Sequence, residues 1–149
     1  MSGRDQLLGQ VAGQSVDLTT TDQAIDFQTL EFIHSRKTGA LFTAAAALGA
    51  MGARGEERAA IISYAKNLGL AFQIVDDLLD VEESSEHLGK TAGKDAQQQK
   101  ITFPAVYGLE RSHRMAEEEC ARAHAALAPF GAGASRLHEL ADMIVNRKS

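Results

Sequence analysis

The stretch that decides the fold is Leu68-Gly-Leu-Ala-Phe-Gln-Ile-Val-Asp-Asp-Leu-Leu-Asp-Val81. Most of its residues are apolar, which is typical of a helix packed on several sides. Its polar residues recur at i, i+3, i+4 and i+7, and this spacing places them on one helical face. We name these residues the polar stripe: Gln73, Asp76, Asp77 and Asp80.

The polar stripe has two interpretations. Unpaired carboxylates are costly to bury, so three of them beside a packed helix predict a cavity that holds compensating cations. Carboxylates in a polar cleft are usual ligands of Mg²⁺, which takes its other ligands from water and substrate phosphates. The alternative is that Asp76, Asp77 and Asp80 are the solvated face of a surface helix, because amphipathic helices are common.

Length and composition predict a single all-α domain over residues 1–149. The chain is 44% hydrophobic, with two prolines and few alternating β-branched runs. Its net charge of -5, without a cluster of basic residues, disfavours nucleic-acid binding. The N-terminus has no charged region followed by an apolar run, and the most apolar window, 41–51, is too short for a membrane span. We therefore expect a cytoplasmic protein without a membrane span.

The single cysteine, Cys120, excludes an intrachain disulfide and fits a reducing compartment. It lies in a charged helical stretch without a set of histidines or aspartates beside it. The sequence therefore favours a structural cysteine over a nucleophile. The five histidines follow no zinc-ligand spacing, so we interpret them as surface or packing residues: His34, His87, His113, His124 and His138.

The pattern of apolar residues predicts the order of the helices. The longest helix is expected from Glu56 to about Val81, followed by a polar loop over 82–99. The other expected helices, in chain order, are the end of a helix over 5–18, then 22–36, 37–51, 105–127 with a break near Arg111, and 134–146. Gly69 lies one turn before the polar stripe, where a small residue permits close approach of another backbone or of a ligand.

Several lysines lie near the polar stripe in the sequence. Lys37 precedes an apolar run, Lys90 and Lys94 flank Gly93 in the polar loop, and Lys100 follows. Cations on flexible stems beside Mg²⁺-binding carboxylates suit a polyphosphate ester. The segment does not have the spacing of a P-loop. Without the stripe, a solvated polar loop would be the simpler interpretation.

Five segments together resemble the C-terminal half of the trans-type isoprenyl diphosphate synthases, the family of geranylgeranyl and farnesyl diphosphate synthases. The aspartates resemble that family's second aspartate-rich motif. The segments follow the family's order: Gly13-Gln-Ser-Val-Asp17, Lys37-Thr-Gly-Ala-Leu41, Phe72-Gln-Ile-Val-Asp-Asp-Leu-Leu-Asp80, Leu88-Gly-Lys-Thr-Ala-Gly-Lys-Asp95 and Lys100-Ile-Thr-Phe-Pro104. The resemblance implies a helical bundle of the isoprenoid synthase type, of which only the C-terminal half is expected here.

The resemblance also implies a reaction, the head-to-tail condensation of an allylic diphosphate with isopentenyl diphosphate. It implies that Mg²⁺ is held by Asp76, Asp77 and Asp80. It further implies diphosphate contacts from Lys37, Lys90 and Lys100, and oxygen dipoles directed at the allylic carbon from Thr38 and Gln73.

The chain also departs from the family pattern. It has no second Asp-Asp-x-x-Asp and no Arg-Arg pair, the features of the family's first aspartate-rich motif. We therefore expect the chain to be inactive alone, and to associate with itself or with a missing N-terminal half. Two alternatives remain open: a non-catalytic subunit that modulates a complete synthase, and a lyase similar to terpene cyclases, which fits the lysine-containing loop poorly.

Overall fold

The computed structural model describes residues 29, 35–88 and 101–148, and its described part is built from helices without strands. This confirms the all-α prediction for the described residues. The elements in chain order are η1 (Ser35–Gly39), α3 (Ala40–Gly49), α4 (Gly55–Leu88), α5 (Phe103–Tyr107), α6 (Leu109–Ala126), η2 (Ala128–Ala134) and α7 (Ser135–Val145).

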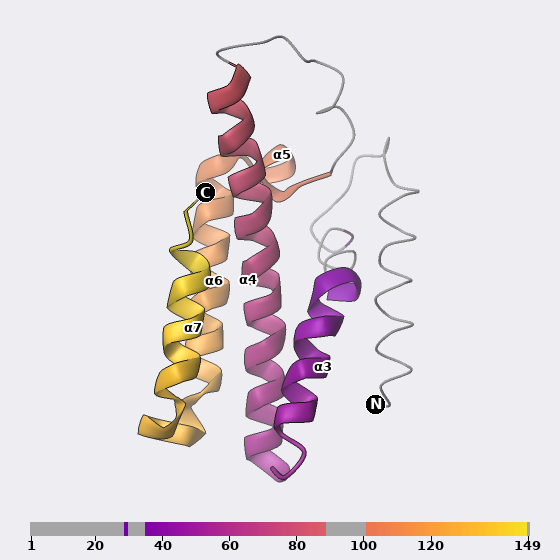
Figure 1. Cartoon of the computed structure of the whole chain (residues 1–149), viewed down its shortest axis with the longest axis vertical. Coiled ribbons are helices and arrows are strands. Elements are labelled where there is room, and N and C mark those ends of the chain that lie inside the picture. Colours follow the sequence, from indigo (N-terminus) through magenta and orange to yellow (C-terminus); the bar gives the residue numbers. More distant parts are fainter. Residues whose placement is uncertain (1–28, 30–34, 89–100, 149) are drawn as a thin grey trace.

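The helix α4 is the axis of the described bundle (Figure 1). On one side it packs against α3, and on the other against α6 and α7. Helices α3, α4, α6 and α7 run alternately up and down (Figure 1). The apolar circumference of α4 is thus used on several sides, as its sequence predicts.

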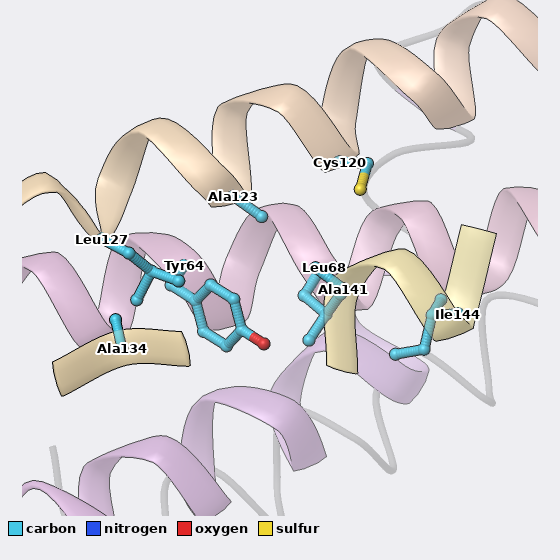
Figure 2. Close-up of a cluster of buried hydrophobic side chains, with 8 residues drawn as sticks. All are labelled: Tyr64, Leu68, Cys120, Ala123, Leu127, Ala134, Ala141 and Ile144. Carbon is cyan, nitrogen blue, oxygen red and sulfur yellow. The ribbon is translucent and has the colours of Figure 1, made fainter. Parts of the chain in front are cut away.

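Two clusters of buried side chains hold the helices together. The first joins the N-terminal half of α4 to α6 and α7, and Figure 2 shows its members: Tyr64, Leu68, Cys120, Ala123, Leu127, Ala134, Ala141 and Ile144. Within it, the Tyr64 hydroxyl donates a 2.8 Å hydrogen bond to the Leu137 carbonyl and ties α4 to α7. The second joins the C-terminal half of α4 to α5 and α6: Ile74, Val75, Leu78, Phe103, Met115 and Ala116.

The prediction that a loop begins directly after Val81 is wrong, because α4 continues to Leu88. The Ser84 and Ser85 hydroxyls donate to backbone carbonyls three residues earlier, at 2.8 and 2.7 Å. Glu82 also contacts His113 of α6 at 3.0 Å. The segment is polar because it extends beyond the apolar core, and glutamate favours helix when no glycine or proline intervenes. The rest of the predicted loop, 89–99, lies outside the described residues.

The predicted break in the 105–127 helix exists, but it falls at Gly108 and not near Arg111. Gly108 adopts φ 80° and ψ 162°, a conformation that glycine accepts readily. The short helix before it starts earlier than predicted: the Thr102 hydroxyl accepts from the Ala105 amide, and Pro104 lies in the first turn. The helix predicted over 134–146 is confirmed as α7.

At Gly69, α4 closely approaches η1 and α3, in agreement with the sequence-based expectation of a close backbone contact. A Cβ atom built at Gly69 would lie 3.3 Å from the Gly39 Cα and 3.3 Å from the Phe42 Cβ. Phe42 in turn packs on Phe72, with ring centroids 5.4 Å apart. A small residue is therefore required for this helix contact.

We predict that Gly69→Val destabilises the chain by about 1–3 kcal/mol, because its branched side chain must displace Gly39 or Phe42. The measurement is urea unfolding followed by circular dichroism. The matched control is Gly49→Val, since a Cβ at Gly49 has nothing within 4 Å. Equal unfolding midpoints for the two variants would contradict the close contact.

Candidate functional site

The polar stripe lies on α4 at the border between the core and solvent. Gln73 is buried, with 7% of its surface exposed. Asp76 and Asp77 are partly exposed and Asp80 is exposed. The exposure of the stripe thus increases from the core toward solvent over two helical turns. Its carboxylates keep access to water, and burying a carboxylate away from water is costly.

Asp76 forms an ion pair with the C-terminal end of the described chain. The Arg147 guanidinium donates to its Oδ1 at 3.1 Å, and the two side chains are 30% and 51% exposed respectively. The same guanidinium lies over the Phe72 ring, 4.5 Å from the centroid. Its Nε is buried without a hydrogen-bond partner among the described residues. A cation therefore already lies beside the stripe, and apolar surface helps to hold it there.

Asp77 has a different neighbour. Its Oδ2 accepts a 3.1 Å hydrogen bond from the Phe103 amide at the start of α5. The first amides of a helix have no partner within the helix, and a carboxylate there also complements the helix dipole. Asp77 therefore anchors α5 on α4, and Phe103 fills the core beside it.

The three aspartates do not form a compact ligand group in this structure. Within the described ranges, Cys120, His124 and Asp142 are the one set of three or more candidate ligand residues whose ligand atoms all lie within 4.8 Å of one another. Asp76 and Asp77 are successive residues, so they point about 100° apart around the helix. Asp76 and Asp80, four residues apart, share one face.

The other residues predicted for the site are only partly described. Thr38 lies in η1, a π-helical turn that packs against α4 next to Gly69. Gln73 follows Gly69 by one turn of α4, so Thr38 and Gln73 belong to the same end of this helix contact. Single π-helical turns occur often at functional sites. Lys37 is in η1 as well, whereas Lys90 and Lys100 lie outside the described residues.

An apolar cavity of about 660 Å³ begins at the contact of η1 and α3 with α4. It lies between α3, α4, η2 and α7, and extends along α4 away from the polar stripe toward the helix N-terminus. Its walls are alanine, leucine, isoleucine and aromatic side chains, among them Phe42, Tyr64, Leu68 and Phe130. Such a cavity suits a hydrocarbon group.

The interpretation of Cys120 as a cysteine without neighbouring ligand residues is wrong. Its Sγ lies near His124 of the same helix and near Asp142 of α7. Burial raises the pKa of the Cys120 thiol, and the negative Asp142 adds to this effect. The sequence feature that could have indicated this cluster is the i, i+4 spacing of Cys120 and His124. The contact of these residues with Asp142 of α7 depends on tertiary structure.

The comparisons with known proteins agree with this fold. A family model described as polyprenyl synthetase matches residues 4–128. The chain is 46% identical over 142 residues to a dimethylallyltranstransferase of Fischerella ambigua, covering 93% of this chain and 41% of that protein. It is 42% identical over 144 residues to a geranylgeranyl diphosphate synthase of Cyanophora paradoxa, covering 95% of this chain and 48% of that protein.

A solved structure gives the same result in three dimensions. The FPP/GFPP synthase of Zymomonas mobilis is 35% identical and superposes with a TM-score of 0.76, over 96% of this chain and 46% of that one. The fold is thus that of the isoprenyl diphosphate synthases. The chain belongs to the polyprenyl synthetase family, and it spans less than half the length of these relatives.

No helix of the described residues is both long enough and apolar enough to cross a membrane.

We predict that Arg147→Ala destabilises the chain by about 1–2 kcal/mol. It removes a partly exposed ion pair, worth at most about 1 kcal/mol, and a cation–π contact of similar size. Urea unfolding measures the loss. Lys148→Ala, which alters the neighbouring exposed cation, should change stability by less than about 0.5 kcal/mol. If the two variants unfold at the same urea concentration, Arg147 does not anchor the C-terminal segment.

Proposed function

We propose that this chain is the C-terminal half of a polyprenyl synthetase domain that transfers prenyl groups in isoprenoid biosynthesis. The reaction is the Mg²⁺-dependent head-to-tail condensation of an allylic diphosphate with isopentenyl diphosphate. The observation that carries this proposal is the polar stripe: three carboxylates on α4 at the border of an apolar core, in a chain of this family.

The donor set fits Mg²⁺. Asp76, Asp77 and Asp80 offer only oxygen ligands, which Mg²⁺ prefers. Mg²⁺ keeps several waters and needs one or two carboxylates plus substrate phosphates, so compact convergence of all three aspartates is not required. Asp76 and Asp80 share a helical face, and the ion pair of Asp76 with the Arg147 guanidinium supports the proposal that a cation binds there.

In this proposal each of the site residues has a role in binding or catalysis. The metal, when bound, supplies the positive charge that stabilises a departing diphosphate. In this proposal Lys37, Lys90 and Lys100 bind the diphosphate as fully charged ammonium groups. Thr38 and Gln73 direct oxygen dipoles toward the allylic carbon, where positive charge develops. Thr38 precedes Gly39, which contacts Gly69, and Gln73 follows Gly69 by one turn of α4.

The apolar cavity supports a substrate with a hydrocarbon tail. Its walls carry no charged side chain among the residues that line it, and it starts at the same helix contact as Thr38. A hydrocarbon tail can therefore lie against apolar side chains beside the site.

We also propose that the chain alone does not catalyse transfer, and that it acts in the cytoplasm. Prenyl transfer needs a second group of carboxylates facing the first, so that the diphosphate is held from both sides. The chain has no second Asp-Asp-x-x-Asp. Large apolar side chains also remain exposed on α3 and in the turn after it, which favours self-association or a partner with the missing half: Leu41, Leu48 and Met51.

We predict that Mg²⁺ strengthens binding of an allylic diphosphate by at least about tenfold, or 1.4 kcal/mol, because the metal offsets repulsion between carboxylates and phosphates. Isothermal titration calorimetry with Mg²⁺ and with EDTA measures this difference. Asp76→Ala should lose the enhancement. His113→Ala, an exposed residue of α6, should keep it. Equal affinity with Mg²⁺ and EDTA in the unaltered chain would contradict the site.

A radiolabelled prenyl-transfer assay separates the catalytic half from a non-catalytic subunit. We expect no product from the chain alone, and product when it is mixed with the N-terminal half of a homologous synthase. Asp76→Ala should abolish that complementation. If the chain changes the rate of a complete synthase instead, and Asp76→Ala does so equally, the modulatory subunit is the correct reading. Product from the chain alone would refute its proposed inactivity.

A further inference from the structure

The helices α6 and α7 bring two i, i+4 pairs together, far from the polar stripe in sequence and different in chemistry. Cys120 and His124 lie on α6, and His138 and Asp142 lie on α7. The ligand atoms of Cys120, His124 and Asp142 are all within 4.8 Å of one another. Residues four apart project from the same helical face, so two such pairs on packed helices can surround one ion.

The orientation of His124 is fixed at both ring nitrogens. Its Nε2 is 2.8 Å from the Asp142 Oδ1, and its Nδ1 is 2.5 Å from the His138 Nδ1. The two rings are within 10° of parallel, with centroids 4.8 Å apart. A metal-binding histidine uses one nitrogen for the ion and donates the other N–H to a partner that orients the ring. His138 is placed to be that partner.

The burial of the three side chains suits a site at the edge of the core. Cys120 is buried in the first apolar cluster, in which Figure 2 also shows Ala141 and Ile144 of α7. The His124 side chain is 29% exposed and the Asp142 side chain 62% exposed. An ion can therefore enter from the Asp142 side while the sulfur stays shielded from water.

The types of donor atom determine which metal ion the cluster prefers. A sulfur, an imidazole nitrogen and a carboxylate oxygen suit Zn²⁺ and related divalent transition metals, whereas Mg²⁺ takes oxygen ligands. Ligands of one tetrahedral ion lie roughly 3.5 Å apart, so the present separations require only side-chain rotation to converge.

We propose that Cys120 Sγ, His124 Nε2 and an Asp142 carboxylate oxygen bind Zn²⁺ or a similar transition-metal ion, with His138 as the positioning residue. Three protein ligands leave the fourth tetrahedral position for water. The bound ion joins α6 to α7. The site shares no ligand residue with the polar stripe, and the proposal does not rest on the proposed prenyl transfer.

Cobalt titration of the whole chain tests the site, because Co²⁺ replaces Zn²⁺ and its bond to a thiolate gives a sulfur-to-metal absorption band. We expect this band in the unaltered chain, and its loss in Cys120→Ala. His124→Ala should weaken Co²⁺ binding at least about tenfold. Two controls should keep the band: His113→Ala, which alters a histidine of α6 outside the cluster, and Asp76→Ala, which alters the stripe.

Zn²⁺ binding to the folded chain should also raise its melting temperature, and His124→Ala should remove that rise. This second measurement decides the matter if Cys120→Ala does not fold, because His124 is only partly buried. The proposal is overturned if the folded, unaltered chain gives no sulfur-to-cobalt band. It is also overturned if the band persists in Cys120→Ala, or if Zn²⁺ stabilises the His124→Ala and unaltered chains equally.

Discussion

The structure depends on the need to pack the apolar residues of α4 while three carboxylates on the same helix keep access to solvent. Burying an uncompensated carboxylate costs several kcal/mol, more than most single contacts contribute. The chain meets this constraint by placing the polar stripe at the border of the core, where Asp76 faces a guanidinium and Asp77 accepts from a helix-terminal amide. These two interactions also help to hold α5 and the C-terminal segment against α4.

Much of this arrangement could be predicted from the sequence, because it rests on local periodicity. The spacing of Gln73, Asp76, Asp77 and Asp80 places them on one helical face whatever surrounds the helix. Gly69 interrupts a run of larger apolar residues, and the structure shows the close helix contact that explains it. The five segments that resemble the family also predicted the type of fold, since their order along the chain is more specific than any single segment.

The remaining features depend on contacts between distant residues or on where a core ends. Arg147 is 71 residues from Asp76, and no pattern within either segment indicates that they meet. The continuation of α4 beyond Val81 was missed because its last turns are polar on all sides, and helix propensity alone decides them. The contact between Cys120 and Asp142 was likewise missed because the two residues are distant in the sequence. Each nevertheless belongs to an i, i+4 pair that can be seen in the sequence.

Helix α7 connects the two candidate metal sites. Asp142 contacts His124 of α6, and Arg147, five residues later, contacts Asp76 of α4. Arg147 lies two residues beyond the end of α7 at Val145, so fixing Asp142 on α6 also limits where Arg147 can reach. The two sites nevertheless select different ions, because the stripe has only oxygen donors whereas the α6–α7 cluster includes sulfur and nitrogen. An ion between α6 and α7 would thus hold the C-terminal segment near the stripe without competing for its carboxylates.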